Sequence, residues 1–491
     1  MQQLALAPQY TYERHRPEET DLCKVVHQNL ETFLKLVEDE CGRTLPDFVI
    51  KEFREYLRCG ILAHGFLRTQ CEKCHNEHLV AFSCKRRGFC PSCGARRMNE
   101  SAIHLVDEVW PVKPVRQWVL SFPIQIRLLL AVQPKLMMNI LKIITRTISR
   151  HLSKKAGIKN SATGSVTLIQ RFGGSINLNV HFHQLFLDGV YELDVDGKPE
   201  AFHITKAPTL DELAEVLDEI IRKITRYLEK RGIIARDEEG FLQMNLEEGD
   251  ALSRIQAGAV TYRFALGPNK GKKALTLQTV SDHDHSSSRG LVVKNSGFSL
   301  HAGVAFSGTE RDKIERLCRY ITRPAVALER LSLNARGQVV YRLKKPYDDG
   351  TTHIVMSPLE LLEKLAAIIP RPRVHLTRYS GVFAPHYKYR SIIVPKREKR
   401  ERRLVDDSDS DKPARMSWAR LLKRVFDIDI SICRLCQGKT KVVAAIEDPH
   451  VIKKILLHLG LPYPAPTPWP ARAPPELDRE FHHQTSEFDL A

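Results

Sequence analysis

The sequence lacks the apolar run of about 18 or more residues that a membrane-spanning helix requires. Its most apolar stretch, residues 118–144, is interrupted by Arg127 and Lys135. Residues 1–14 lack the apolar segment of a secretory signal. We therefore expect neither a membrane protein nor an exported one, and instead a cytoplasmic protein.

The sequence also lacks an internal repeat and the phosphate-binding loop GxxxxGK[ST]. Any nucleotide-driven unwinding of DNA would therefore come from another protein, such as a host helicase. Acidic residues are outnumbered: 58 Asp and Glu stand against 75 Lys and Arg, a net charge of +17. This surplus favours a polyanionic partner, and nucleic acid is the first candidate.

Helical periodicity and strand-like alternation both occur along the 491 residues, which predicts an α+β fold. Composition divides the chain into five parts. They are a helical, cysteine-rich domain at 1–114, a large domain at 115–395 that contains the candidate catalytic residues described below, a charged linker at 396–417, a small CxxC unit at 418–461 and a proline-rich tail at 462–491.

Individual elements follow from the same patterns. Helices are expected at 25–56, over most of 117–157, at 309–322 before Pro324, and after Ser357, which suits an N-cap. Strands are expected at 164–193, as a hairpin turning at Gly173-Gly174, and at 257–266, 297–306, 338–343 and 351–356.

Two histidines lie two residues apart in a strand-like segment. In residues 177–185, apolar Val180 and Phe182 alternate with His181 and His183. Side chains alternate between the faces of a strand, so both imidazoles point the same way, about 7 Å apart along the chain. Such a pair can chelate one divalent cation. Two ordinary half-buried histidines are the alternative interpretation.

Tyr320 lies on the flank of an amphipathic helix. The apolar residues of this helix form one stripe at helical spacing, namely Ile314, Leu317, Cys318 and Ile321. Tyr320 lies about 110° from the centre of the stripe, and Lys313 and Arg316 share its side. Two cations beside a partly exposed phenol suit a tyrosine that attacks a phosphodiester. A boundary tyrosine packed against the sheet is the alternative.

Together these two features fit one reaction. A cation held by His181 and His183 polarises a phosphate, and Tyr320 attacks it, becomes joined to the 5′ phosphate and releases a 3′ hydroxyl. Phosphate oxygens favour a hard ion, so Mg²⁺ or Mn²⁺ is expected. The candidates for a third ligand are, in order, His301, Asn179 and Asp188, with His283 and His285 less favoured because they lie in a polar loop.

Four of the 11 cysteines form two CxxC pairs near the N-terminus. Cys71 and Cys74 are separated by 15 residues from Cys90 and Cys93, a spacing typical of a structural tetrathiolate zinc ribbon. Neighbouring residues could substitute or form a second site, namely Cys59, Cys84, His64, His75 and His78.

Basic residues accompany the cysteines. Lys85, Arg86 and Arg87 lie between the two pairs and suit phosphate contacts, so we expect this unit to bind DNA. The basic run at 396–403 either grips phosphate or is a solvated linker.

The pair Cys433 and Cys436, followed by Gly438, is only half a zinc site. His450 and His458 could complete it, but a second CxxC at normal spacing is missing nearby. Zinc binding and two free thiols both remain open for this pair.

The His181-Phe182-His183 motif resembles the one that names the HUH endonuclease superfamily, two histidines flanking a hydrophobic residue. Longer segments resemble the insertion sequence 91 (IS91) family of rolling-circle transposases, namely residues 58–65, 82–94, 181–191 and 316–324. The resemblance covers roughly residues 20–400. It implies an HUH core with a central antiparallel sheet flanked by helices, an N-terminal zinc ribbon and a small C-terminal unit.

One position departs from the pattern. Founding members of the family carry two tyrosines four residues apart, whereas here Arg316 and Pro324 lie four residues before and after Tyr320. The chain thus resembles a single-tyrosine, common-region-like branch. Either the first 3′ hydroxyl resolves the intermediate, or a second subunit contributes.

The resemblance implies a bacterial transposase, associated with the nucleoid when bound to DNA, that cleaves and rejoins single-stranded DNA through a 5′-phosphotyrosine. A replication initiator or relaxase with the same chemistry is an alternative. A second alternative is a non-catalytic zinc-ribbon DNA-binding protein.

Overall fold

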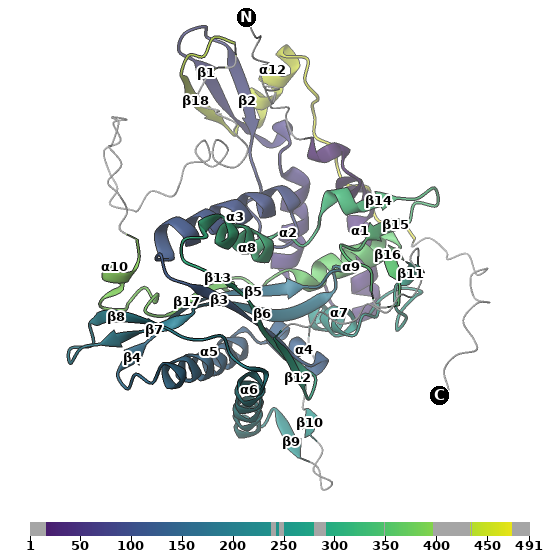
Figure 1. Cartoon of the computed structure of the whole chain (residues 1–491). Coiled ribbons are helices and arrows are strands. Elements are labelled where there is room, and N and C mark those ends of the chain that lie inside the picture. Colours follow the sequence, from purple (N-terminus) through teal and green to yellow (C-terminus); the bar gives the residue numbers. More distant parts are fainter. Residues whose placement is uncertain are drawn as a thin grey trace, which may run out of the picture.

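The computed structural model describes residues 16–236, 242–244, 250–278, 291–347, 349–395, 433 and 435–473. Helices and antiparallel sheets alternate along these residues, which confirms the α+β class (Figure 1). The predicted linker at 396–417 and the loop histidines His283 and His285 lie outside the described residues.

A six-stranded antiparallel sheet lies at the centre of the molecule (Figure 1). In spatial order its strands are β12 (Val292–Asn295), β13 (Phe298–Phe306), β3 (Val115–Ser121), β6 (Leu178–Leu187), β5 (Gly164–Phe172) and β17 (Thr377–Gly381). β5 and β6 form the hairpin predicted around Gly173-Gly174, and β13 is the strand predicted at 297–306.

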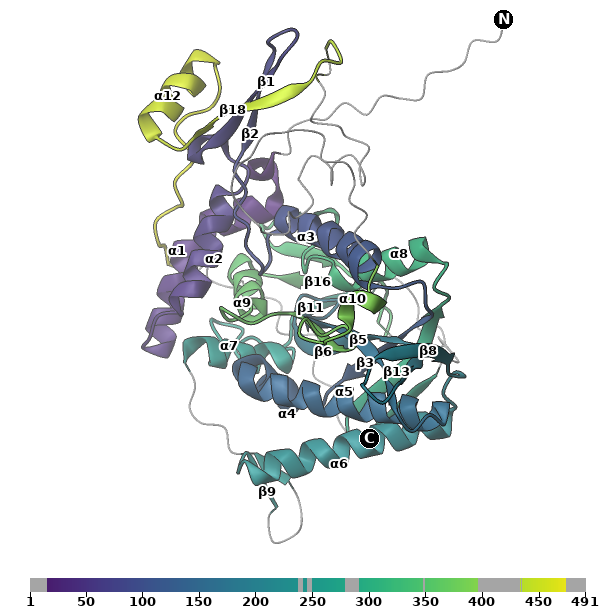
Figure 2. The same cartoon turned by 90° about the vertical axis from the view of Figure 1, so that its left-hand side faces the viewer.

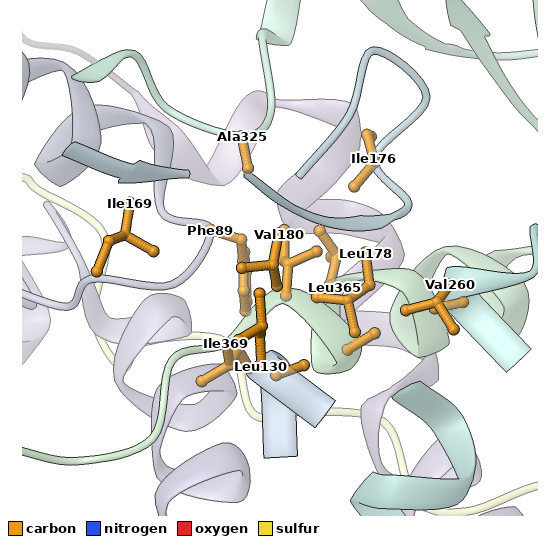
Figure 3. Close-up of a cluster of buried hydrophobic side chains, with 14 of the residues drawn as sticks. Phe89, Leu130, Ile169, Ile176, Leu178, Val180, Val260, Ala325, Leu365 and Ile369 are labelled. Atoms are coloured by element: carbon orange, nitrogen blue, oxygen red, sulfur yellow. The ribbon is translucent and has the colours of Figure 1, made fainter. Parts of the chain in front are cut away.

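One face of this sheet carries the main hydrophobic core. Val180 and Phe182 on β6 are fully buried there. The helices α4 (Ile124–Val132), α7 (Ala251–Val260) and α9 (Pro358–Ile368) contact β6. Figure 3 shows Val180 surrounded by side chains of the same core, among them Leu130 and Leu365. α9 begins with the predicted N-cap, because Ser357 accepts from the backbone of Glu360 in a capping box.

The opposite face carries the histidines and is covered by α3 (Pro91–His104) and α8 (Arg311–Thr322), which lie side by side (Figure 1). The apolar stripe of α8, at Ile314, Cys318 and Ile321, is buried in a second core with β5 and β6. α8 ends at Thr322, as expected from Pro324 two residues later.

The N-terminal part combines two helices with a small sheet. α1 (Asp21–Cys41) and α2 (Asp47–Arg58) precede the hairpin of β1 (Phe66–Cys71) and β2 (Glu77–Ala81). The strand β18 (Thr440–Ile446) pairs antiparallel with β1, and α12 (Pro449–His458) packs beside them (Figures 1 and 2). The described part of the predicted C-terminal unit therefore joins the N-terminal hairpin instead of standing apart.

The remaining elements surround this framework. They are α5 (Pro134–Ala156), α6 (Leu210–Lys230), α10 (Arg390–Ile393), β4 (Ser161–Ala162), β7 (Gly189–Leu193), β8 (Pro199–Ile204), β9 (Ile234–Arg236), β10 (Leu242–Met244), β11 (Leu275–Gln278), β14 (Leu331–Leu333), β15 (Val339–Arg342) and β16 (Thr351–Met356). β15 and β16 form the predicted strand pair. Within the described residues, no helix is both long and apolar enough to cross a membrane.

Three predicted elements were wrong. The helix predicted at 25–56 is broken after Cys41, where Gly42 adopts a left-handed conformation with φ of 64°. The start of the helix predicted at 117–157 is β3, whose residues are buried on both faces and so lack strand-like alternation. The strand predicted at 257–266 begins inside α7, which is capped by Asp250.

Candidate active site and cysteine clusters

His181 and His183 lie on the face of β6 that α3 and α8 cover. Their ring centroids are 4.9 Å apart, as the strand alternation predicts for two residues on one face. His183 is buried, and His181 is partly buried. The two rings are therefore close enough to bind one ion from the same side.

Hydrogen bonds orient both rings. His181 Nδ1 lies 2.8 Å from the backbone carbonyl oxygen of Asn179, and because a carbonyl only accepts, Nδ1 carries the hydrogen and Nε2 keeps its lone pair. His183 Nδ1 lies 2.8 Å from the side-chain amide of Gln117 on β3. As it stands, the amide nitrogen of Gln117 donates to Nδ1 of His183. If the amide turns by 180°, its oxygen accepts from the N–H at Nδ1, and Nε2 of His183 is then free to bind a metal.

Burial keeps both imidazoles neutral. Loss of solvent, with a smaller contribution from the positive charge of Arg323, lowers the pKa of His181 to about 4 and that of His183 to about 3. A neutral imidazole is the form that binds a metal. Nε2 of His183 and Oδ1 of Asn179 are both buried without a hydrogen-bond partner, so the site offers acceptor atoms that fit a cation.

Asn179 is the third-ligand candidate that lies nearest along the histidine face, two residues before His181. The first candidate, His301, lies two strands away, since it pairs with Val119, which in turn pairs with His183. That separation is about 10 Å at the usual strand spacing. Among the described residues, no group of three or more His, Cys, Asp or Glu side chains arranged for a metal includes His301. The prediction of His301 as a ligand is therefore not supported by its position.

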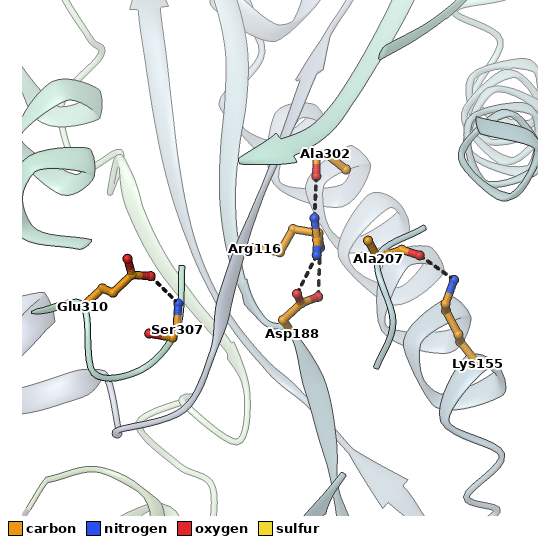
Figure 4. A network of polar contacts seen from close by, with 7 residues as sticks. All are labelled: Arg116, Lys155, Asp188, Ala207, Ala302, Ser307 and Glu310. Atoms are coloured by element: carbon orange, nitrogen blue, oxygen red, sulfur yellow. Dashed lines mark hydrogen bonds and ion pairs between the residues drawn. The ribbon is translucent and has the colours of Figure 1, made fainter. Parts of the chain in front are cut away.

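Asp188 is engaged elsewhere. It forms a buried, bidentate ion pair with Arg116, with N···O distances of 2.9 and 2.7 Å, and Arg116 also donates to the carbonyl oxygen of Ala302 (Figure 4). This network ties β3 to the end of β6 and to β13. Because both carboxylate oxygens are used there, Asp188 is not available as the third ligand.

Tyr320 lies on α8 with 45% of its surface exposed. The cations in contact with its ring are Arg323 and Lys344, each 4.5 Å from the ring centroid. The sequence had suggested Lys313 and Arg316 for this role. Instead, Lys313 forms an ion pair with Glu310 at 2.5 Å, and Arg316 is exposed on the helix.

The end of α8 is attached to the strand next to the histidines. Gln170 on β5 pairs directly with His181 on β6, and its side-chain amide donates to the carbonyl oxygen of Ile321 at 3.0 Å. Arg323, one turn after Tyr320, is near enough for its charge to lower the pKa of both histidines. The last turn of the tyrosine helix and the histidine pair thus belong to one region of the molecule.

α3 packs closely against the same end of α8. A Cβ atom at Gly94 would lie only 2.7 Å from Cβ of Pro324, so only glycine allows this approach. The hydroxyl of Thr322 also donates to the backbone of Met98 at 3.5 Å. The position of Tyr320 therefore depends on α3, which begins at the second CxxC pair.

Eight of the 11 cysteines form two groups of four, and in each group the sulfur atoms lie within 4.8 Å of one another. One group is Cys59, Cys84, Cys90 and Cys93, and the other is Cys71, Cys74, Cys433 and Cys436. Four sulfur ligands at this spacing suit a tetrahedral structural zinc ion.

The predicted grouping of Cys71 and Cys74 with Cys90 and Cys93 was wrong. The first pair lies at the distal turn of the β1–β2 hairpin, whereas the second pair opens α3 at the base of the unit. Cys59 at the end of α2 and Cys84 after β2 complete the second pair. No histidine belongs to either group, neither His64, His75 and His78 nor His450 and His458.

In the basic loop at residues 85–87, two of the three side chains contact other parts of the protein. Arg86 forms an ion pair with Glu55 at 3.8 Å, and Arg87 donates to the carbonyl oxygen of Val374 at 2.7 Å. Lys85 is exposed. Arg87 is exposed as well, but its guanidinium is engaged by Val374.

Two protein-family models match the chain. Residues 164–390, which include the histidine pair and Tyr320, match a model described as "Putative transposase". The chain is thus a transposase, a DNA-processing enzyme whose partner is DNA.

Residues 25–122, which include the complete Cys59, Cys84, Cys90 and Cys93 group, match the transposase zinc-binding domain of the IS91 type. Together the two matches support an IS91-family transposase, and the domain match with the Cys59, Cys84, Cys90 and Cys93 group supports structural zinc. No curated protein and no solved structure matches it.

Proposed function

We propose that this transposase cleaves and rejoins single-stranded DNA through a covalent 5′-phosphotyrosine at Tyr320, in transposition of the rolling-circle type. One observation carries the proposal. The hydrogen bond from Gln170 to Ile321 joins the tyrosine helix to the strand beside His181. A phosphate between the phenol and the histidines would then be reached by both.

The histidine pair is the proposed cation site. His181, His183 and Asn179 would hold Mg²⁺ or Mn²⁺, since their acceptor atoms face the same side of the sheet. When bound, such an ion withdraws charge from the phosphate oxygens. Gln117 orients His183 and keeps its Nε2 directed at the site.

Tyr320 is the proposed nucleophile. Its oxygen attacks the phosphorus, the bond from phosphorus to the 3′ oxygen breaks, and the leaving strand takes up a proton as a 3′ hydroxyl. Because the side chain is half exposed, the phenol proton can pass to solvent. Arg323 and Lys344 attract the phosphate and stabilise the charge that develops on it.

Rejoining reverses these steps, with a 3′ hydroxyl attacking the phosphotyrosine and releasing the phenol. One tyrosine per site means that this hydroxyl is either the first one released or one created in a second subunit. A host helicase would supply single-stranded substrate, as no phosphate-binding loop of the GxxxxGK[ST] type is present in the sequence.

The test uses the full-length protein, a labelled single-stranded oligonucleotide carrying the element end, and Mg²⁺ or Mn²⁺. A protein–DNA adduct that survives denaturation is expected, with the DNA mapped to Tyr320 by mass spectrometry. Tyr320→Phe should abolish the adduct and leave DNA affinity nearly unchanged. Tyr262→Phe, at another partly exposed tyrosine, is the matched control and should give the wild-type yield.

Variants of the histidines separate the two metals. His181→Ala with His183→Ala should remove cation-dependent cleavage, while the zinc content stays as in the wild type. An undiminished adduct from Tyr320→Phe would defeat the assignment of the nucleophile. If the wild type bound the correct DNA tightly but formed no adduct, the protein would be a DNA-binding protein without this chemistry.

A further inference from the structure

The cysteine group at the tip of the β1–β2 hairpin joins residues that are more than 350 positions apart in the sequence. Sγ of Cys71 lies 3.5 Å from Sγ of Cys436, and Sγ of Cys74 lies 3.5 Å from Sγ of Cys433. The CxxC pair that is only half a site in the sequence therefore meets the first CxxC pair of the chain.

The sulfur spacing fits a tetrahedral zinc ion. Zinc–sulfur bonds of about 2.3 Å in a tetrahedron place the sulfur atoms about 3.8 Å apart. The contacts in this group are 3.5 Å, and those in the group of Cys59, Cys84, Cys90 and Cys93 are 3.5 to 3.7 Å. Disulfide bonds would need sulfur atoms about 2.05 Å apart.

The backbone around the sulfurs is shaped for ligation. The N–H groups of Lys73 and Cys74 point at Sγ of Cys71, at 3.4 and 3.5 Å, and such donors stabilise a thiolate. On the other pair, the N–H of Gln437 donates to the carbonyl oxygen of Cys433, with Gln437 at a φ of 59°.

Gly438 allows the two CxxC turns to approach each other. A Cβ atom there would lie 3.0 Å from Sγ of Cys71 and 2.7 Å from Cβ of Lys73. The glycine noted after the second pair in the sequence thus has a role in closing this group.

The elements that the group joins have little hydrophobic core of their own. Four buried residues hold α12 to the base of the hairpin, namely Leu62, Phe66, Ile452 and Leu456. On β18, Val442 and Val443 are exposed. A unit this small usually needs a metal or a disulfide to be stable.

We propose that Cys71, Cys74, Cys433 and Cys436 bind a second zinc ion, which fastens the C-terminal segment to the N-terminal hairpin. The ion fixes the start of β18, and pairing with β1 follows from Cys71 to Phe66. Further along, the N–H of Trp469 donates to the carbonyl oxygen of His27, and the N–H of Arg472 donates to the hydroxyl of Thr32 on α1. Residues 435–473 are thereby part of the N-terminal unit.

Metal analysis of the full-length protein tests the site. Two zinc ions per chain are expected in the wild type by plasma mass spectrometry, and one in the double variant Cys433→Ser, Cys436→Ser. The remaining ion shows that the group around Cys90 is still folded. Cys41→Ser, at a cysteine outside both groups, is the matched control and should keep two ions. One zinc ion in the wild type, or two in the double variant, would overturn the proposal.

Limited proteolysis tests the fastening. Cleavage within residues 440–473 is expected to be at least about tenfold faster in the double variant than in the wild type or in Cys41→Ser, because local opening exposes a segment to proteases. Equal cleavage rates in all three proteins would show that the ion does not hold the segment. Neither measurement uses DNA, so the outcome is independent of the chemistry proposed for Tyr320.

Discussion

At the scale of single residues, burial sets the chemistry of His181 and His183. Both side chains are largely removed from solvent and have a hydrogen bond at Nδ1, and Nε2 of His183 is buried without a partner. A buried polar atom without a partner destabilises the folded state, and this cost is offset only when a ligand binds there. This cost is what the proposed cation site would offset.

The same burial predicts a dependence of stability on pH. The folded pKa values of about 4 and about 3 lie below the unfolded value, so the unfolded chain takes up protons first as the pH falls below about 6.5. Each histidine should lower the free energy of unfolding by on the order of 1–2 kcal/mol between pH 7.5 and pH 5.

Urea unfolding of protein dialysed free of Mg²⁺ and Mn²⁺ measures this effect. The difference in the free energy of unfolding between pH 7.5 and pH 5 should be smaller in the His181→Gln, His183→Gln double variant than in the wild type. A double variant with the wild-type pH dependence would show that these rings do not titrate as their burial requires.

Arg323 and Lys344 are the cations that contact the Tyr320 ring. Arg323→Ala should slow formation of the protein–DNA adduct by at least about tenfold, because a cation aimed at the developing charge is lost. Arg316→Ala removes the same charge from the exposed surface of the same helix and should change the rate less than threefold or so. Equal losses in the two variants would mean that general attraction of DNA, and not contact with the site, is what matters.

The sequence predicted the residues whose spacing is local and missed those whose contacts are not. His181 with His183, and Tyr320 outside its apolar stripe, follow from strand and helix periodicity. Arg323 could have been found, since it lies three residues after Tyr320, directly after the end of the helix. Lys344 reaches the ring from beyond β15, and no short-range pattern indicates that.

At the scale of elements, the approach of α3 to α8 makes the tyrosine helix dependent on the zinc-binding unit. Gly94→Ala would place a methyl group 2.7 Å from Cβ of Pro324, so the two helices must separate. Overpacking of this kind costs about 1–3 kcal/mol. The variant should show reduced adduct formation at unchanged zinc content.

Ser92→Ala is the control for this change. It adds no bulk and lies on the exposed side of the same helix turn, so the adduct yield should stay at the wild-type level. If Gly94→Ala also retained full yield, the close contact would not be what positions Tyr320.

The hairpin of β5 and β6, the strand β13 and the helices α8 and α9 were predictable because turn glycines, alternation and caps mark them locally. β3 was not, since a strand covered on both faces shows a continuous apolar run that is shared by buried helices. This error also hid Gln117, whose side chain reaches His183 only because β3 and β6 are neighbours.

At the scale of the whole molecule, pairings between distant segments determine which cysteines group together and which strands are neighbours, and sequence patterns do not predict such pairings. The CxxC spacing correctly indicated zinc, but not how the cysteines are shared, because Cys59 and Cys433 come from outside the predicted ribbon. β18 pairs with β1, which lies about 370 residues earlier in the sequence. Such contacts leave no periodic signal in the chain.

The net charge of +17 bears on how the whole molecule binds DNA. Affinity for a single strand should fall steeply with salt, with a slope of about 0.7 in log Kd per log salt for each phosphate contacted. Lys85 is exposed, so Lys85→Ala should reduce the slope by roughly that amount and weaken binding to all sequences about equally.

Arg87 donates to the backbone of Val374, so Arg87→Ala should lower the midpoint of thermal unfolding instead and leave the salt slope nearly unchanged. Fluorescence anisotropy from 50 to 300 mM salt, roughly the range over which phosphate contacts dominate, distinguishes the two. A reduced slope in Arg87→Ala and none in Lys85→Ala would reverse these roles and place the DNA path over the other side of the loop.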